Sequence, residues 1–188
     1  MQSKEWDIHL FLYRRPWDQP LLPHSDLLLA RAGALFSGAE GGWSVCRPPG
    51  EKPFFAHRPE LHFSLSHSGD FWLCAMSRQE LGLDLQQQRV QQVERLSRRF
   101  FSPQELDFLQ QQDYADFFSV WAAKEAFVKH SGRGIRQDFG SFSVAGPQGL
   151  LEEVAGLQLR QLPFLPGYSL CLCAERLCCV LLRLLSLR

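Results

Sequence analysis

Hydrophobic and polar residues alternate at several points along the chain, a pattern typical of half-buried β-strands. Near the N-terminus Ile8, Leu10 and Leu12 occupy every second position. Three further runs, 61–66, 71–77 and 81–86, are separated only by short polar stretches, so we expect an antiparallel meander there. The apolar run 177–188 is expected to form a buried strand close to the C-terminus.

Apolar residues at helical spacing predict helices in three regions. The first covers 25–36, with Ser25 as its N-cap and Gly38 just beyond its end. In the second, Val90, Val93, Leu96 and Phe100 recur at helical spacing, and a helix restarts at residues 102–105, which form a capping box with proline at the first helical position. The third covers 116–130 and ends at Gly132. Strands and helices mixed without regular βαβ alternation indicate an α+β fold.

Composition narrows the functional class. Twenty basic and 20 acidic residues balance to a net charge of zero, which argues against a nucleic-acid binder that works by bulk attraction. The charged residues near the start do not fit a signal peptide, and the last apolar run is shorter than the ~20 residues of a membrane span. We therefore expect a cytoplasmic protein without membrane contact. The six cysteines form no CxxC pair and are expected to be reduced core thiols.

Two polar residues share one face of the run 81–86. Strand alternation places Asp84 and Gln86 opposite the neighbouring leucines, with their Cα atoms about 6.5–7 Å apart. Oxygen ligands of this kind suit Mg2+. A solvated strand face explains the same pattern, so the pair alone leaves both interpretations open.

Glu125 and Lys129 lie four residues apart in the third helix and so on one side of it. They could form an ordinary surface salt bridge, or Glu125 could bind a metal while Lys129 contacts a phosphate. The stretch Ser66 to Gly69 reads as a polar connection in which backbone groups can approach an anion. Lys52 and Arg31 in the N-terminal part could add positive charge for binding an anion, or they could be ordinary exposed residues.

Taken in order, these motifs resemble the signature of the surfactin-type 4'-phosphopantetheinyl transferases. The matching segments are FSLSHSG at 63–69, GLDL at 82–85, RFFS at 99–102 with Glu105, and WAAKEAFVK at 121–129 before Gly132 and Gly134. The resemblance runs from about Gly50 to Val144. It implies two similar α+β lobes related by pseudo-twofold symmetry, residues 1–80 and 81–188, with the active site in the cleft between them.

The resemblance also implies a reaction and a set of site residues. A monomer would transfer phosphopantetheine from coenzyme A to a serine of an apo acyl or peptidyl carrier protein, with Mg2+ as cofactor and 3',5'-ADP as product. The implied metal ligands are Asp84, Gln86 and Glu125; the implied catalytic residues are Glu125, Lys129, His67 and Glu105; and the implied coenzyme A contacts are Arg31, Lys52, Ser66, His67, Lys124 and Lys129.

Some points stay open. The general base could be Glu105, Glu125 or a water held by the metal, and the capping role is favoured for Glu105. The family pattern has Asp-x-Glu where this chain has Asp84-x-Gln86, which predicts weaker metal binding. Together with a short N-terminal lobe, Gln86 motivates an alternative: a non-catalytic relative that binds coenzyme A or a carrier protein. A carrier is expected to dock near Arg95, Arg98 and Arg99.

Overall fold

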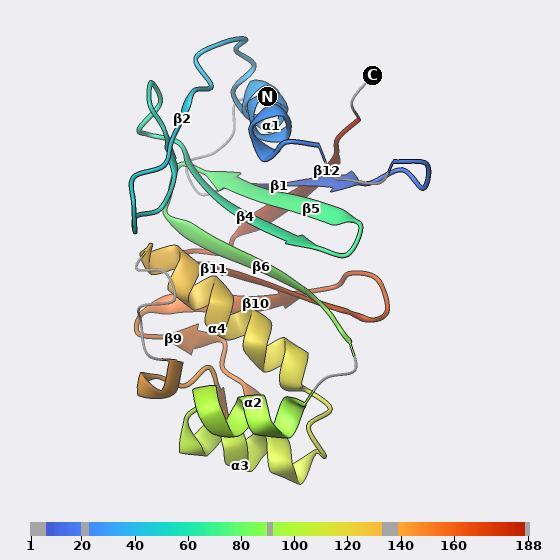
Figure 1. The fold of residues 1–188 in the computed structure, drawn as a ribbon. Coiled ribbons are helices and arrows are strands. Elements are labelled where there is room, and N and C mark those ends of the chain that lie inside the picture. The colour runs from blue at the N-terminus through green and yellow to red at the C-terminus, as the bar shows by residue number, and fades with distance from the viewer. Residues whose placement is uncertain (1–6, 20–22, 90–91, 133–138, 187–188) are drawn as a thin grey trace.

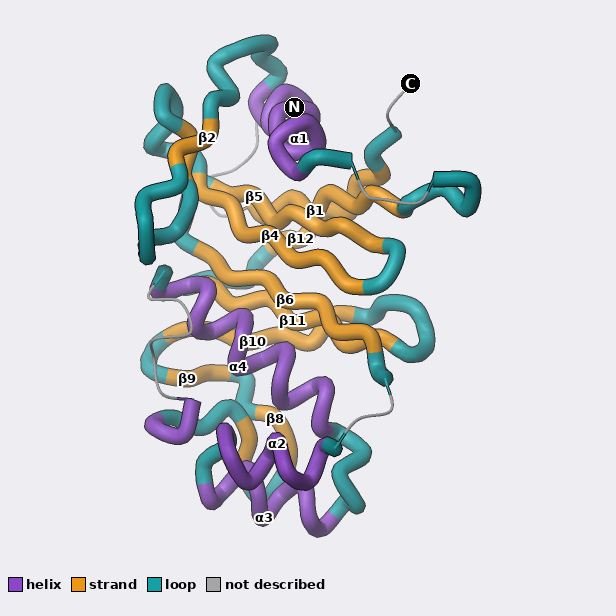
Figure 2. The backbone as a smooth tube through the Cα atoms, in the orientation of Figure 1, coloured by secondary structure: helices purple, strands orange, loops and turns teal. Residues whose placement is uncertain are grey.

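The computed structural model describes residues 7–19, 23–89, 92–132 and 139–186. Its elements stack in layers, with one helix, two β-sheets and a group of helices following one another (Figures 1 and 2). The mixture of separate sheets and helices confirms the α+β class.

The first sheet has the strand order β12-β1-β5-β4. Its members are β1 (Asp7–Arg14), β4 (His62–Ser68), β5 (Phe71–Ser77) and β12 (Cys179–Leu184). β1 is parallel to β12 and antiparallel to β5, and β5 is antiparallel to β4. Helix α1 (Ser25–Ser37) covers the outer face of this sheet, and two short strands, β2 (Val45–Cys46) and β3 (Phe54–Phe55), lie in the connection that follows it.

The second sheet has the order β6-β11-β10-β9, and all of its pairings are antiparallel. It consists of β6 (Leu81–Gln87), β9 (Glu153–Val154), β10 (Leu157–Leu162) and β11 (Tyr168–Ala174). Helix α4 (Phe117–Ser131) lies across its outer face, with α2 (Val93–Phe100) and α3 (Pro103–Gln111) beyond it. The remaining short elements are η2 (Phe139–Ser141), β7 (Ala145–Gly146) and β8 (Gly149–Leu150).

Three apolar clusters separate the layers. One lies between α1 and the first sheet, one between the two sheets, and one between the second sheet and helices α3 and α4. The middle cluster draws alternate residues from both sheets, such as Leu10 and Leu83, as expected for two sheets packed face to face. The boundary expected after residue 80 separates the strands of the first sheet from those of the second, except β12, which returns to the first sheet.

The helix predictions are confirmed with one correction at an end. Helix α3 begins with the full capping box of Ser102 and Glu105, and α4 ends at Gly132, whose φ of 68° needs a residue tolerant of the left-handed region. The N-cap of α1 is His24 rather than Ser25, because the His24 ring accepts the N–H of Asp26. The calls on Val90 and Gly134 fall outside the described residues.

The predicted three-stranded meander is wrong at its third strand. β4 and β5 form the expected hairpin, but β6 pairs with β11 in the other sheet. β4 and β6 still run side by side, as the edge strands of two sheets, joined by three serine hydroxyls of β4. We call this set the serine ladder: Ser64 accepts the N–H of Leu83 at 2.9 Å, Ser66 that of Leu85 at 3.0 Å, and Ser68 that of Gln87 at 2.9 Å.

Removing a hydroxyl of the serine ladder should destabilise the fold. In Ser64→Ala the buried N–H of Leu83 loses its partner, which costs about 1–3 kcal/mol of unfolding free energy. Urea denaturation followed by circular dichroism measures the loss. Ser37→Ala, which removes an exposed helix-end hydroxyl bonded to Gly33 O, is the matched control and should change stability by less than about 0.5 kcal/mol. Equal effects in both variants would argue against the ladder.

The C-terminal run differs from its prediction. β12 is an edge strand rather than a buried one, and Leu182 and Leu184 are 61% and 75% exposed. The cysteine prediction holds for Cys74, Cys171 and Cys173, which are free and buried, whereas Cys178 and Cys179 are exposed, and Cys46 is half-buried. Among the described helices none combines the length and apolarity required to cross a bilayer.

The backbones of β6 and α4 touch at Gly82. A Cβ atom at this position would collide with the carbonyl oxygen of Ala126 and crowd the N–H of His130. Only glycine permits so close an approach of helix and strand. The contact fixes the second half of α4 directly over the strand that carries Asp84.

Candidate active site

Asp84 is the centre of a polar cluster at the junction of β4, β6 and α4. Its side chain is 3% exposed. Oδ1 accepts hydrogen bonds from Ser66 Oγ at 2.9 Å and Lys129 Nζ at 2.6 Å, and Oδ2 accepts one from Gln86 Nε2 at 2.7 Å. The predicted neighbours Ser66, Gln86 and Lys129 are therefore brought together around one carboxylate.

Glu125 adds a second acidic group to this cluster. It lies half-buried on α4, one turn before Lys129. Burial raises the pKa of Glu125, the negative charge of Asp84 raises it further, and the ammonium of Lys129 opposes both effects. Two carboxylates in each other's field are the arrangement that a divalent cation would stabilise.

The cluster fits Mg2+ as a site of two carboxylates with a neighbouring amide. Among the described residues no group of three histidine, cysteine, aspartate or glutamate side chains could hold a metal, so a third charged ligand is lacking there. Mg2+ accepts few protein oxygens and keeps several waters, so a pair of carboxylates such as Asp84 and Glu125 is compatible with it. The amide nitrogen of Gln86 faces Asp84, so this residue acts here as a hydrogen-bond donor to the Asp84 carboxylate.

A pocket of about 250 Å3 adjoins the cluster and is bordered by two lysines. These are Lys129 of α4 and Lys52 from the connection between β2 and β3. The ammonium of Lys52 donates to Glu80 Oε2 and to Leu81 O, each at 2.7 Å, and burial lowers its pKa while Glu80 partly compensates. The pocket thus offers two cationic groups beside apolar walls. Its lining residues are Glu51, Lys52, Pro53, Phe63, Ser64, Leu65, Lys129 and Gly132.

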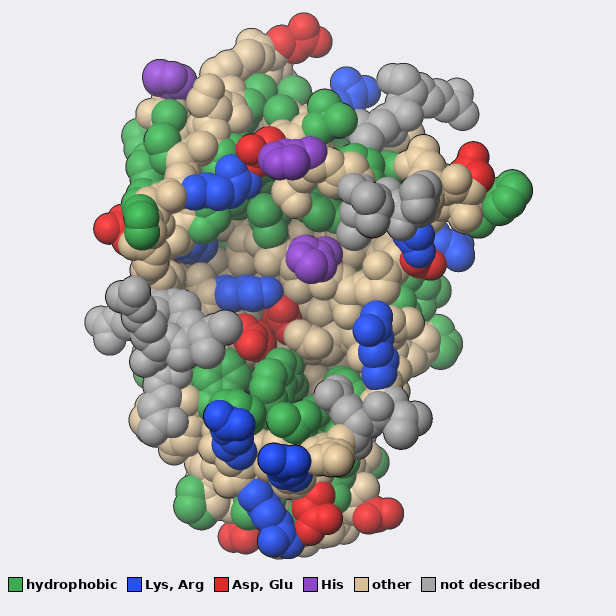
Figure 3. Space-filling model, in the orientation of Figure 1, with side chains coloured by type: hydrophobic (Ala, Val, Ile, Leu, Met, Phe, Trp, Pro, Cys, Tyr) green, Lys and Arg blue, Asp and Glu red, His purple; other side chains and the backbone are tan. Residues whose placement is uncertain are grey.

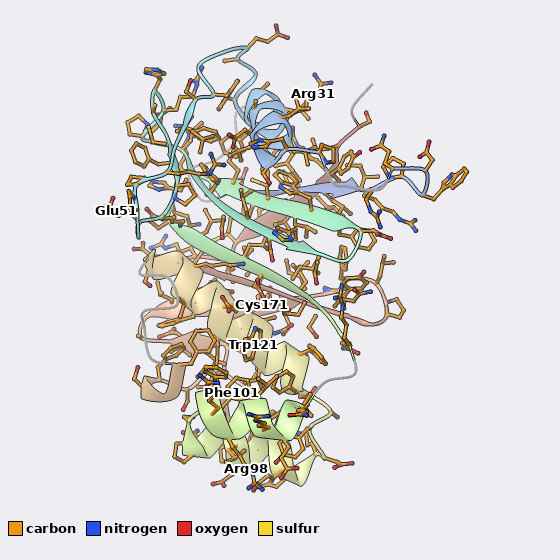
Figure 4. The ribbon with its side chains drawn as sticks, viewed as in Figure 1. Arg31, Glu51, Arg98, Phe101, Trp121 and Cys171 are labelled. Atoms are coloured by element: carbon orange, nitrogen blue, oxygen red, sulfur yellow. The ribbon has the colours of Figure 1, made fainter. Side chains whose placement is uncertain are left out.

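Two predicted coenzyme A contacts are exposed and do not line this pocket. His67 is exposed and belongs to β4 itself, so the polar connection expected at 66–69 is shorter and contains only Gly69 and Asp70. Arg31 is exposed on α1, on the outer side of the first sheet, and Figure 4 shows it at the opposite end of the molecule from Arg98. The roles assigned to His67 and Arg31 remain predictions.

Glu105 and Lys124 form a second ionic cluster that is completely enclosed. Both side chains are 0% exposed, and Lys124 Nζ donates to Glu105 Oε1 at 2.8 Å, to Oε2 at 2.7 Å and to Phe142 O at 2.7 Å. Glu105 also accepts the N–H groups of Ser102 and Val144. The capping role of Glu105 is confirmed, and Lys124 is not accessible to coenzyme A in this conformation.

Helix geometry explains why adjacent residues of the WAAKEAFVK motif enter different clusters. Lys124 and Lys129 are five residues apart, which at 3.6 residues per turn separates them by about 140° around the helix. Lys124 therefore points toward α3, where Glu105 lies, and Lys129 points toward β4 and β6. One helix supplies both a buried structural lysine and a lysine of the polar cluster.

An aromatic and basic surface lies next to the polar cluster. Phe100 of α2 packs edge-on against Trp121 at 5.8 Å between ring centroids, and the guanidinium of Arg99 lies 5.0 Å from the Phe100 ring. Figure 3 shows acidic groups near the middle of this face, hydrophobic side chains below them and Lys and Arg side chains at the lower end. Arg95 and Arg98 on α2 are exposed as well.

Sequence reasoning missed the structural use of Ser64 and Ser68. Serines at every second position of a strand read as one polar face, and Ser66 was considered only as a phosphate contact. In the structure these hydroxyls hold β6, and Ser66 additionally orients Asp84. The regular spacing of the three serines indicates that they share one face of β4. It does not indicate which strand their hydroxyls contact.

Comparison with known proteins matches this part of the chain to one family. The model of the 4'-phosphopantetheinyl transferase superfamily matches residues 80–172, which include Asp84, Glu105, Lys124, Glu125 and Lys129. Over these residues, which make up just under half of its length, the chain is similar to the 4'-phosphopantetheinyl transferase superfamily. It resembles surfactin-type members of that superfamily, as the motifs indicated.

The relatives agree with the family match. A 4'-phosphopantetheinyl transferase of Bacillus subtilis is 34% identical over 126 residues, which is 63% of this chain and 55% of the relative. The 4'-phosphopantetheinyl transferase Sfp of B. subtilis strain 168 is 32% identical over 135 residues, 65% of this chain and 59% of the relative. The transferase psf-1 of Bacillus pumilus is 38% identical over 96 residues, 49% and 41% respectively. The chain thus spans little more than half the length of the first two relatives.

Proposed function

We propose that this protein transfers the 4'-phosphopantetheine group of coenzyme A to a serine of an apo acyl or peptidyl carrier protein, with Mg2+, releasing 3',5'-ADP. The observation that carries the proposal is the cluster of Asp84, Glu125 and Lys129 within the superfamily match. We further propose that the two sheets with their helices act as similar lobes and that coenzyme A binds between them. The alternative of a non-catalytic binder lacks support, since the relatives are named as transferases.

The residues of the cluster divide the work of phosphoryl transfer, which depends on charge neutralisation and alignment more than on covalent help. Asp84 and Glu125 would hold Mg2+, which when bound neutralises charge on the diphosphate. Ser66 keeps Asp84 in one rotamer by donating to its Oδ1. Lys52 and Lys129 would flank the phosphates of coenzyme A in the adjoining pocket.

We assign Glu105 no part in proton transfer. Both of its oxygens are engaged by Lys124, and its remaining acceptor capacity serves the amides of Ser102 and Val144. A base must reach the proton of the attacking hydroxyl within hydrogen-bond distance, and a fully enclosed carboxylate has no such path. Among the candidate side chains this leaves Glu125, which is half-buried beside Asp84 and Lys129 and whose pKa burial raises.

We propose the aromatic and basic surface as the docking site of the carrier protein. Trp121 lies four residues before Glu125 on α4 and so on the same side of the helix. Phe100 extends that apolar area onto α2, and Arg95, Arg98 and Arg99 border it. An acidic carrier surface with an apolar centre would be complementary, and its serine would be held beside the polar cluster.

One assay tests the proposed function. The protein is incubated with coenzyme A, MgCl2 and an apo carrier protein, and the carrier is analysed by mass spectrometry. We expect a gain equal to one phosphopantetheine group on a serine, abolished by EDTA. Coenzyme A binding by calorimetry without a mass gain on acyl and peptidyl carriers alike would refute the transfer reaction.

Restoring a glutamate at position 86 should strengthen metal binding. Gln86→Glu adds a negative charge beside Asp84, so the Mg2+ concentration for half-maximal transfer should fall by about fivefold or more. Transfer rates measured over a range of MgCl2 concentrations give this value. Gln88→Glu, an exposed position two residues further on, is the matched control and should leave it unchanged. A higher Mg2+ requirement in Gln86→Glu would contradict the role given to position 86.

A further inference from the structure

The ammonium group of Lys129 occupies a position that a metal would need. Its Nζ lies 2.6 Å from Asp84 Oδ1, 3.2 Å from Leu65 O and 3.5 Å from Ser66 Oγ. All three acceptors belong to residues of β4 and β6 within the polar cluster. Lys129 is thus the counter-ion of the buried Asp84 carboxylate.

Lys129 and a divalent cation cannot both hold Asp84 in this way. Mg2+ would approach a carboxylate oxygen to ~2.1 Å, and an ammonium at hydrogen-bond distance from the same group would lie within about 4 Å of it, where like charges repel strongly. The other oxygen, Oδ2, is already engaged by Gln86. Occupation of Asp84 by the metal would therefore displace Lys129 from Oδ1 or leave two cations close enough to repel each other.

The pocket beside Lys129 can accommodate its ammonium group in a second position. Its side chain is 30% exposed and borders the 250 Å3 pocket, which Lys52 lines as well. The four-carbon stem of lysine is flexible, so its ammonium can turn from Asp84 to the pocket without displacement of α4. A phosphate bound in the pocket would supply the negative charge that Lys129 loses when it leaves Asp84.

We propose that Lys129 is an exchangeable counter-ion, paired with Asp84 before ligands bind and with a phosphate of coenzyme A afterwards. The inference rests on the proposed function, because it assumes a metal at Asp84 and a phosphate ligand in the pocket. The exchange makes the binding of the two ligands cooperative. Binding of the metal to Asp84 frees Lys129 to pair with the phosphate, and binding of the phosphate draws Lys129 away from Asp84. By linkage, each ligand must strengthen the binding of the other by the same factor.

Lys129→Met separates the two contributions. It keeps the length of the stem and removes the charge that competes for Asp84. In the absence of coenzyme A, the variant should bind Mg2+ about fivefold or more tightly than the parent protein. With coenzyme A present, the variant should lose most of the mutual enhancement between Mg2+ and coenzyme A and bind coenzyme A more weakly.

The measurement is the unfolding temperature as a function of MgCl2 concentration, with and without coenzyme A, supported by calorimetric titration of coenzyme A in MgCl2 or EDTA. A pH of about 8 disfavours protonation of Glu125, which matters because loss of Lys129 removes the charge that opposes the raised pKa of that residue. Lys52→Met is the matched control: it removes a lysine from the same pocket that pairs with Glu80 instead of Asp84. Its Mg2+ affinity should stay within about twofold of the parent value.

The outcomes are distinct. Tighter Mg2+ binding in Lys129→Met alone supports the exchange. Unchanged or weaker Mg2+ binding in a folded Lys129→Met protein overturns it, as does an equal gain in Lys52→Met, which would indicate only bulk electrostatics. The Mg2+ titrations without coenzyme A decide the exchange, and no titration contains a carrier, so a failure of the transfer reaction and a failure of the exchange are seen in separate experiments.

Discussion

Asp84→Asn should lower the rate of phosphopantetheine transfer by about a thousandfold or more, the size of effect expected when a principal source of charge stabilisation is removed from a phosphoryl-transfer site. The substitution keeps the shape of the side chain. Its carbonyl oxygen can still accept from Ser66 and Lys129, while its amide group faces Gln86, whose own amide can rotate to present an oxygen. The fold should therefore persist, and the loss should reflect the missing charge.

The measurement is the rate of carrier modification at saturating coenzyme A over a wide range of MgCl2, with circular dichroism to verify folding. Asp107→Asn, which neutralises an exposed aspartate on α3, is the matched control and should retain full activity. Transfer within about tenfold of the parent rate in a folded Asp84→Asn protein would remove Asp84 from the metal site. Recovery of the rate at high MgCl2 would instead indicate a ligand that is weakened but still used.

Lys124→Met should cost about 3–5 kcal/mol of unfolding free energy, the largest effect on stability that we expect from a single change. The substitution leaves the carboxylate of Glu105 enclosed without its counter-ion, and it also removes the bond to Phe142 O. The amides of Ser102 and Val144 compensate only part of the charge. Because Glu105 caps α3, the start of that helix should loosen as well.

Guanidinium unfolding of Lys124→Met, Glu105→Gln and the double variant measures the pair as a cycle. We expect the double variant to be less damaged than the sum of the two single variants, because no unpaired charge remains in it. Arg98→Ala, which breaks an exposed ion pair with Glu94 at i,i+4, should cost only about 0.3–0.5 kcal/mol. A cost below about 1 kcal/mol for Lys124→Met would mean that the pair contributes little to the fold.

Local patterns predicted the elements better than their partners. Alternation located β6 and correctly placed Asp84 and Gln86 on one face, because the side chains of residues two apart always share a face of a strand. The same pattern could not show that β6 pairs with β11, more than 80 residues further along, because strand pairing depends on the packing of the whole chain. The meander was predicted because β6 follows β5 closely in sequence. In the structure β6 is held to β4 by the hydroxyl groups of the serine ladder instead of by backbone hydrogen bonds to β5.

In the candidate active site, too, the sequence predicted local features but not tertiary contacts. The motif located Lys124, Glu125 and Lys129 within six residues, but it did not show which of them faces the solvent. That distinction depends on how α4 is rotated over β6, which is fixed by tertiary contacts. The capping box, in contrast, is a local signal, and it correctly favoured a structural role for Glu105. The pairing of Lys129 with Asp84 joins residues 45 apart in the chain and had no signature in the sequence.

The contact at Gly82 bears on how this protein can change over evolutionary time. Where a helix rests on a strand through side chains, each exchange of one apolar residue for another shifts the two elements slightly. Here main chain meets main chain at Ala126, so the strand that carries Asp84 and the helix that carries Glu125 keep their separation whatever fills the core around them. The sequence can therefore drift far while the two acids stay in register, provided that position 82 remains glycine.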